Sequence, residues 1–494
     1  MSKYGLEITV FLSGAALMIL ELAGSRLLAP FVGTSLVVWT SLIGIIMGAL
    51  SLGYYAGGKI ADRQAKAEVL AAIILAAAFT VLGVATVSFF VLAVIGASIL
   101  GLYLKAVIAA VLLFALPSFL LGIVSPYAVK LKINSLAYTG RTVGDLYALS
   151  TIGSIAGTFA AGFWLIPFFG TMKILFFIAF LLIVAAAILA PRRLFKIKLL
   201  AILILLLLLI IFLKTSALAS EMGFVDVDSQ YNRIWIYPSR DVATGRPVLR
   251  LSTDPFGIQS AMFTDRDDDL VFKYLKYYRL GDVLNPGIKN ALMIGGAAYS
   301  YPKDFLKNHL QANLDVVEID AKMTEVAKKY FNLPDDPRLK IYHEDARIFL
   351  NNNQKKYDAV YVDAFNSHLS VPYQLTTQEA VREIYRGLND GGVAIVNIIS
   401  AISGDKGKFL RAEYATYQSV FPQVYLFQVD ALNSTQVQNL ILIAVKSNQG
   451  ANFQSANLEY QGMLGMIWRE PLAADMPILT DDYAPVDYYT MNLF

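Results

Sequence analysis

The chain has 494 residues, of which 56% are hydrophobic and only 16% charged, and its mean hydropathy is +0.54. Such an average excludes an ordinary soluble protein, because a water-facing surface needs more charge. The net charge of +3 is too small to indicate nucleic-acid binding, and the lack of cysteine excludes disulfides, thiolate-bound zinc and thiol nucleophiles.

Apolar residues are concentrated between positions 6 and 214, and the rest of the chain has the composition of a globular domain. A membrane-spanning helix needs about 20 mostly apolar residues. The sequence therefore predicts a multi-pass α-helical membrane domain over residues 1–215. Seven spans are expected in it, at about 6–30, 35–58, 69–96, 102–129, 146–167, 170–190 and 197–214.

Two features of this half concern the inside of the helix bundle. The small-residue segments GYYAGG (53–58) and GTFAAG (157–162) predict close helix packing. Glu21 and Arg26 lie in the first span, where ionisable groups are costly and usually pair or line a polar path. An ion pair between Glu21 and Arg26 is the leading interpretation, and a transport path is the alternative.

The loops between the spans carry an asymmetric charge. Basic residues follow the second, fourth and sixth spans, namely Lys59, Arg63, Lys66, Lys130, Lys132, Arg141, Arg192, Arg193, Lys196 and Lys198. Positively charged loops stay in the cytoplasm, so the N-terminus is expected inside. Seven spans would then place the C-terminal half outside.

A small β-region is expected over residues 222–285. FVDVDSQYNRIWIYP and VLRLSTD alternate apolar and polar residues, which predicts antiparallel strands. The following DDDLVFKYLKYYRLGDVL (267–284) predicts a polar helix.

Residues 286–494 read as a Rossmann-like α/β domain. Buried strands are predicted at 290–296, 314–320, 339–345, 357–365 and 391–399, with helices between them at 302–312, 321–331, 346–353 and 377–388. Such alternation implies a parallel sheet with helices on both faces.

Ligands of such sheets bind at the carboxyl ends of the strands. Gly295 and Gly296 end the first strand, where they let the backbone approach a ligand. Glu318 ends the second strand, 22 residues after Gly296, a spacing at which an acid accepts the ribose hydroxyls of a nucleoside. Asp345 and Asp363 end the third and fourth strands. For each carboxylate alone, the cap of a helix N-terminus is the alternative.

Several segments together resemble the polyamine aminopropyltransferases, the spermidine synthases. They are NALMIGGAAYS, VVEID, HEDARIFL, YDAVYVDAF and LTTQEAVREIYRGLNDGGVAIVN, and the resemblance spans about 225–445. The family's N-terminal β-region is similar to DSQYNRI (228–234) and GIQ (257–259). Its membrane-fused branch is similar to the combination of the membrane helices and LTDDYAPVDYY (479–489). The resemblance implies a class I methyltransferase-type sheet that binds S-adenosylmethionine or its decarboxylated form as substrate, with no separate cofactor. A metal site is not expected, because the three histidines, His309, His343 and His368, lie far apart in the sequence.

Residue by residue, the resemblance implies these roles. Glu318 would bind the ribose, and Asp345 with Ala346 would contact adenine. Gln259 would lie near the sulfonium end, and Asp363 would be the general base that takes a proton from the attacking amine. Apart from the resemblance, Tyr231 is a candidate to cover the site by aromatic stacking on adenine or on the sulfonium, and core packing is the alternative.

The departures from the family point to another reaction. Two family acids are replaced, by Ala298 and by Asn366, and a Tyr-His pair reads Phe272-Lys273. Fewer acids and an added Lys273 favour a ligand that carries a carboxylate, as S-adenosylmethionine does. That carboxylate could displace methylthioadenosine and form homoserine lactone, with Asp363 binding the α-ammonium group. The leading hypothesis is therefore an S-adenosylmethionine lyase.

Three alternatives stay open. The first is aminopropyl transfer, which is supported by the retained Asp363, with Asp481 and Asp482 as further negative charge. The second is a methyltransferase. The third is a non-catalytic nucleoside sensor that gates a transporter. The expected partners are a sulfonium nucleoside and the lipid bilayer, with no nucleic acid; the oligomeric state, a homo-oligomer included, is open. The chain is expected in the cell membrane. S-adenosylmethionine is a cytosolic metabolite, so its supply favours a cytoplasmic catalytic domain. The charge pattern of the loops, combined with seven spans, predicts the opposite side.

Overall fold

The computed structural model describes residues 4–133, 139–190, 194–266, 269–364, 371–491 and 493. Its contacts divide the chain into two compact units. One contains Met1–Met222 and Asp226–Arg233, and the other contains Gly223–Val225 and Ile234–Phe494.

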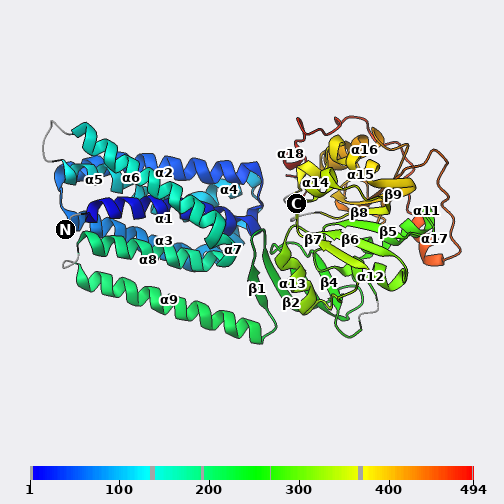
Figure 1. Ribbon diagram of the computed structural model, residues 1–494, viewed down its shortest axis with the longest axis horizontal. Helices are drawn as coiled ribbons and strands as arrows, with labels where there is room; N and C mark the ends of the chain where they lie inside the picture. Colours follow the sequence, from blue (N-terminus) through cyan, green and yellow to red (C-terminus); the bar gives the residue numbers. More distant parts are fainter. Residues whose placement is uncertain are drawn as a thin grey trace. The chain divides into compact units, whose positions relative to one another are not determined.

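The membrane unit consists of long apolar helices (Figure 1). Seven helical spans among the described residues are long and apolar enough to cross a membrane, as the sequence predicts. They comprise α1 (Gly5–Val32), α2 (Leu36–Arg63), α3 (Ala67–Gly96), α4–η1–α5 (Leu102–Ala110, Val111–Ala115, Leu116–Lys132), α6–η3–α7 (Thr139–Ala160, Ala161–Leu165, Ile166–Phe168), α8 (Thr171–Leu189) and α9 (Phe195–Glu221).

Glycines set the closest helix contacts in this unit. A Cβ at Gly57 of α2 would lie 2.8 Å from the carbonyl oxygen of Ile123 in α5. A Cβ at Gly157 of α6 would lie 2.5 Å from the carbonyl oxygen of Ala15 in α1. Both glycines belong to the small-residue segments, so the predicted role of these segments in helix packing is confirmed.

The predicted ion pair between Glu21 and Arg26 is not found among the described residues. Arg26 instead lies 3.4 Å from the carboxylate of Asp228 and donates to the carbonyl oxygens of Ser229 and Tyr231, at 2.6 Å each. The prediction was wrong because the partner comes from a segment about 200 residues away in the sequence.

The β-region has strands β1 (Val225–Asp228), β2 (Arg233–Arg240), β3 (Pro247–Ser252) and β4 (Ser260–Phe263). β2 pairs with β3 and β3 with β4, both antiparallel, as predicted. The helix predicted over 267–284 is shorter and broken into α10 (Lys273–Lys276), the 3₁₀ turn η4 (Tyr277–Leu280) and α11 (Gly281–Leu284). Gly281 weakens a regular helix here, and the buried Tyr277 and Tyr278 show that packing decides the local path.

The main sheet has seven strands in the order β10-β11-β9-β8-β5-β6-β7. β5 to β9 are parallel, as predicted, whereas β10 and β11 form an antiparallel edge that the sequence analysis did not foresee. The strands are β5 (Asn290–Ile294), β6 (Asn313–Val317), β7 (Leu339–Tyr342), β8 (Tyr357–Val362), β9 (Leu388–Ser400), β10 (Gln423–Gln428) and β11 (Gln438–Val445).

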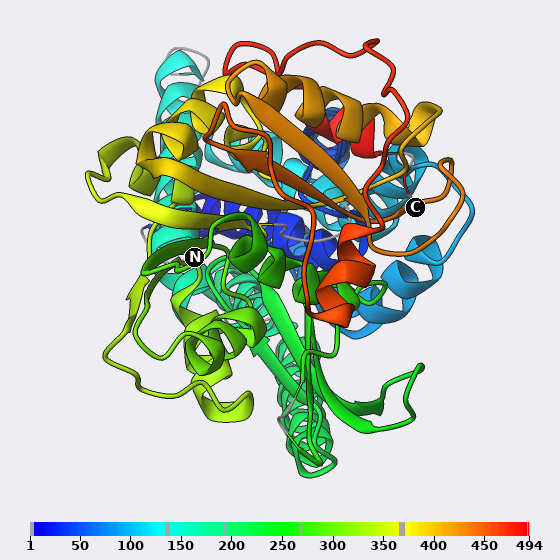
Figure 2. The ribbon, with the colours of Figure 1, turned by 90° about the vertical axis from the view of Figure 1, so that its right-hand side faces the viewer.

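Helices cover both faces of this sheet, each over its own apolar core. Figure 2 shows α16 on one side of the sheet and α17 on the other. The helices and turns are α12 (Ser300–Asn308), α13 (Ala321–Tyr330), α14 (Ala346–Asn352), η5 (Tyr373–Leu375), α15 (Gln378–Gly387), η6 (Asp405–Gly407), α16 (Lys408–Gln418), α17 (Leu458–Leu464) and α18 (Val486–Thr490).

Candidate active site

The four polar strand ends read from the sequence lie side by side. Strands β8, β5, β6 and β7 are neighbours in that order. Their carboxyl ends are followed by Asp363, Gly295, Glu318 and Asp345, respectively. The parallel arrangement therefore brings all four to one edge of the sheet, where ligands of such folds bind.

A tight turn follows β5. Gly295 has φ +89°, and a Cβ there would lie 2.3 Å from the carbonyl oxygen of Asp363. Ala297 and Tyr299 also have positive φ, +45° and +56°. Non-glycine residues in this region are strained, so the surrounding packing must hold the turn.

The turn is tied to Glu318. One carboxylate oxygen of Glu318 accepts the backbone N–H groups of Gly296 (2.9 Å) and Ala297 (3.1 Å). The other accepts the N–H group of Asp320 at 2.9 Å. Burial raises the pKa of Glu318, and these three hydrogen bonds oppose that rise by favouring the charged form. The carboxylate is thus fixed in orientation between β5 and β6.

Asp345 also serves as a helix cap. Its Oδ1 accepts the backbone N–H groups of Arg347 (2.8 Å) and Ile348 (3.1 Å) at the start of α14, and Ala346 is the first residue of that helix. The alternative of an N-cap is therefore present for this carboxylate. Contact of Asp345 and Ala346 with adenine remains a prediction.

A cavity of about 220 Å³ opens beside Asp363. It brings together three residues singled out from the sequence, Gln259, Lys273 and Asp363. The rest of its lining mixes apolar and polar side chains, namely Ile258, Phe272, Tyr274, Ala297, Asn397, Ile399, Val429, Asp430 and Asn439.

Asp363 is held by two hydrogen bonds. The hydroxyl of Tyr274 donates to Oδ2 at 3.1 Å, and the amide of Asn397 donates to Oδ1 at 3.0 Å. Desolvation raises the pKa of Asp363, and the hydrogen bonds from Asn397 and Tyr274 lower it in part. Asp363 is therefore a stronger base than an aspartate in water and has a fixed direction, as proton abstraction requires.

The residues that support Asp363 were not predicted from the sequence. Asn397 could have been recognised from the sequence, because it is a polar residue in the apolar run VAIVNII of β9. Tyr274 lies in a segment for which the sequence predicted only a polar helix. Asn439 lies in β11 and Asp430 just beyond β10, and this antiparallel strand pair was not predicted.

Lys273 does not present a free charge. Its Nζ lies 3.0 Å from Asp430 Oδ1. Gln259 accepts the N–H of Thr253 at 2.8 Å and donates to Asp254 at 3.2 Å. Of the remaining predicted residues, Tyr231 belongs to the unit that contains the membrane helices, and Asn366 lies outside the described residues.

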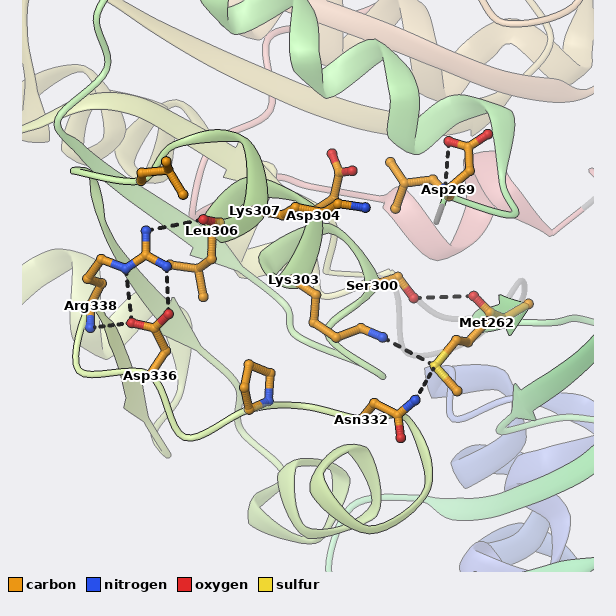
Figure 3. Close-up of a pocket in the computed structure, with 14 residues that line it drawn as sticks. Met262, Asp269, Ser300, Lys303, Asp304, Leu306, Lys307, Asn332, Asp336 and Arg338 are labelled. Carbon is orange, nitrogen blue, oxygen red and sulfur yellow. Dashed lines mark hydrogen bonds and ion pairs between the residues drawn. The ribbon is translucent and has the colours of Figure 1, made fainter. Parts of the chain in front are cut away.

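A second, larger cavity of about 410 Å³ lies beside α12 (Figure 3). Two of the three cations in its described lining have protein partners: Arg338 pairs with Asp336 at 2.6 Å, and Lys303 donates to the carbonyl oxygen of Phe331 at 2.8 Å. Its described lining contains none of the predicted site residues. The cavity at Asp363 is thus the better candidate for chemistry.

Comparisons with known proteins find matches that include this part of the chain. Residues 278–453 match the family model of the spermine/spermidine synthase domain. The chain is similar to a probable polyamine aminopropyl transferase of Bifidobacterium longum, 29% identical over 308 residues, which cover 57% of this chain and 67% of that protein. It is also similar to a polyamine aminopropyltransferase of Vibrio vulnificus, 27% identical over 205 residues, which cover 41% and 67%. A solved structure of a probable spermidine synthase from Corynebacterium glutamicum aligns at 22% identity with a TM-score of 0.40, covering 47% of this chain and 82% of that one.

Proposed function

We propose that this chain, whose C-terminal half carries a spermine/spermidine synthase domain, is a membrane-bound aminopropyltransferase that uses decarboxylated S-adenosylmethionine and an amine. One observation carries the proposal. Asp363 is a desolvated carboxylate with a raised pKa, held by Tyr274 and Asn397 at the wall of a cavity large enough for an amine.

The reaction is a nucleophilic displacement. Asp363 accepts a proton from the ammonium group of the bound amine, which frees the nitrogen lone pair. The nitrogen attacks the aminopropyl carbon next to the sulfonium sulfur, so that a C–N bond forms and the bond between that carbon and sulfur breaks. The sulfur keeps the electron pair and leaves as neutral methylthioadenosine, and the proton passes from Asp363 to solvent. A raised pKa suits this role, because a stronger base takes the proton more readily.

The neighbouring strand ends suit the nucleoside. Glu318 has both oxygens oriented by three backbone N–H groups and keeps one acceptor position, on Oε1, for a ribose hydroxyl. Gly295 and Gly296 bring the backbone close without a side chain in the way. We infer that adenosine lies across β5 and β6, with its sulfonium end toward Asp363 on β8.

The lyase hypothesis loses one of its two physical arguments in this geometry. Besides the loss of family acids at Ala298 and Asn366, it used Lys273 as a partner for the carboxylate of S-adenosylmethionine. Lys273 pairs with Asp430 instead, so the cavity offers no uncompensated cation among its described lining residues. A site with two aspartates and one lysine favours a cationic ligand.

The test is turnover by the full-length chain in detergent or lipid nanodiscs. With decarboxylated S-adenosylmethionine and 1,4-diaminobutane we expect methylthioadenosine in equal amount to the amine consumed. Methylthioadenosine formed from S-adenosylmethionine alone, with no amine, would replace this proposal by the lyase. Formation of S-adenosylhomocysteine would indicate a methyltransferase.

A further inference from the structure

The cavity beside Asp363 contains a second carboxylate, Asp430. It lies just beyond β10, where its N–H donates to the side chain of Gln438 at 3.2 Å. β10 and β11 are separated from β8 by β9, so Asp430 and Asp363 approach the cavity from different parts of the sheet edge. Apolar side chains, Ile258, Phe272, Ile399 and Val429, make up much of the remaining lining.

The partner of Asp430 is a cation of the protein itself. Lys273 Nζ lies 3.0 Å from Asp430 Oδ1, and the two side chains are about half exposed, at 58% and 52%. Exposed ion pairs contribute little to stability, because water screens them and two flexible side chains must be ordered. Exchange of the lysine ammonium for another ammonium on Asp430 is therefore nearly neutral in free energy.

From this geometry we propose that Asp430 determines amine specificity by binding the far ammonium group of the substrate, and that Lys273 is a tethered cation that holds Asp430 until the amine displaces it. The inference rests on the proposed aminopropyl transfer and adds a residue to it. A linear amine with a cation at each end would place one end at Asp363 and the other at Asp430. Its methylene chain would contact the apolar lining.

The ion pair then acts as a built-in competitor. Removal of Lys273 frees Asp430 and favours the dication, whereas removal of the Asp430 charge leaves Lys273 to repel it. The two substitutions are therefore expected to act in opposite directions on the same ligand. A monoamine has no second ammonium group, so neither substitution should matter much for it.

The experiment compares Lys273→Met, Asp430→Asn and the double variant in the full-length protein. Turnover is measured with 1,4-diaminobutane and with butylamine. Asp430→Asn should raise KM for the diamine about tenfold, as expected for loss of a charged contact, with little change in kcat. Lys273→Met should lower KM for the diamine two- to fivefold, because an exposed ion pair competes only weakly with the substrate. In the double variant the repulsion by Lys273 is gone but so is the Asp430 charge, so KM for the diamine should fall below that of Asp430→Asn and stay above that of the parent. KM for butylamine and for the nucleoside should stay near the parent values.

Asp335→Asn is the matched control, because it breaks another exposed lysine–aspartate pair, Lys328–Asp335, away from the cavity. Equilibrium binding of radiolabelled 1,4-diaminobutane in the presence of methylthioadenosine gives a readout without turnover. If the parent binds the diamine without turnover and Asp430→Asn binds it more weakly, the proposed reaction fails and the Asp430 site stands. If Asp430→Asn binds the diamine as tightly as the parent, the Asp430 site is overturned whether or not transfer occurs. If the parent neither binds nor transfers, both are overturned.

Discussion

Asn397 Nδ2 lies 3.0 Å from Asp363 Oδ1, and Asn439 Nδ2 lies 2.9 Å from Asn397 Oδ1. The second bond fixes which way the Asn397 amide faces, because its oxygen is taken by Asn439 and its NH₂ group is left to donate to the carboxylate. A relay from β11 through β9 thus orients the proposed base at the end of β8.

The first prediction concerns the base itself. Asp363→Asn removes the proton acceptor and keeps the shape of the side chain, so kcat for amine transfer should fall about 10²- to 10⁴-fold. Binding of decarboxylated S-adenosylmethionine, measured by calorimetry, should change much less. Unchanged kcat in a folded variant would remove Asp363 from the chemistry.

The second prediction is a pH dependence. Asp363 works as its carboxylate, and its pKa is raised above the ordinary aspartate value. Activity should therefore fall as the pH drops through this raised pKa, at a higher pH than for an exposed aspartate. Asn397→Ala removes a hydrogen bond that lowers the pKa, so the acid limb of the kcat profile should move to higher pH.

Tyr274→Phe provides an independent check, since the tyrosine also donates to Asp363 and lowers its pKa. It should move the acid limb in the same direction. A shift to lower pH in both variants would contradict the assignment of the limb to Asp363.

The third prediction separates close packing from backbone strain. Gly295→Ala places a Cβ 2.3 Å from the Asp363 carbonyl oxygen at φ +89°, whereas Gly287→Ala meets no atom within 4 Å at φ +86°. Both should lose about 1–2 kcal/mol from the left-handed backbone. Gly295→Ala alone should lose more stability and also activity, measured by thermal unfolding and turnover in detergent. Equal effects would mean that the approach of β5 to β8 is unimportant.

The fourth prediction concerns the nucleoside. Glu318→Gln replaces an acceptor of three backbone N–H groups by an amide whose NH₂ must face one set of donors. We expect Kd for methylthioadenosine to rise at least tenfold, from about 1–3 kcal/mol of lost hydrogen bonding. Glu325→Gln is the control, because Glu325 is an exposed residue paired with Lys322 on α13. Unaltered nucleoside affinity in Glu318→Gln would place the ribose elsewhere.

The fifth prediction concerns the tie between α1 and the segment 226–233. Arg26 is only 16% exposed and bonds to Asp228, Ser229 and Tyr231, and Asp228 also accepts the N–H of Thr171 at 2.8 Å. Arg26→Gln should lower stability by about 1–3 kcal/mol, because two partly buried acceptors, Asp228 and the carbonyl oxygen of Ser229, lose a charged donor.

Thermal unfolding of the full chain in detergent measures this effect. Lys130→Gln is the control, since the Lys130–Asp62 pair is exposed and should contribute little. A loss of stability no larger in Arg26→Gln than in Lys130→Gln would show that the contacts of Arg26 are not stabilising.

The sequence alone determined the membrane helices and the main polar residues of the sheet edge. Long apolar runs can satisfy their backbone in a bilayer only as helices, so composition predicts the spans. Gly295, Glu318 and Asp363 could be found because parallel strands carry their carboxyl ends to one edge, and the apolar runs mark where each strand stops.

Only the tertiary structure decided the charge balance of the site. Asn397 in β9 contacts Asp363, and Asp430, just beyond β10, contacts Lys273. Side-chain packing over long sequence separations decides how these strands pair. The charge of Lys273 could not be judged until Asp430 was found 157 residues away, and the same holds for Arg26 and Asp228. Local periodicity specifies which face of a helix or strand is buried. Which charged side chains meet depends on how distant elements pack. The resulting charge of the cavity decides whether a cationic or an anionic ligand is favoured.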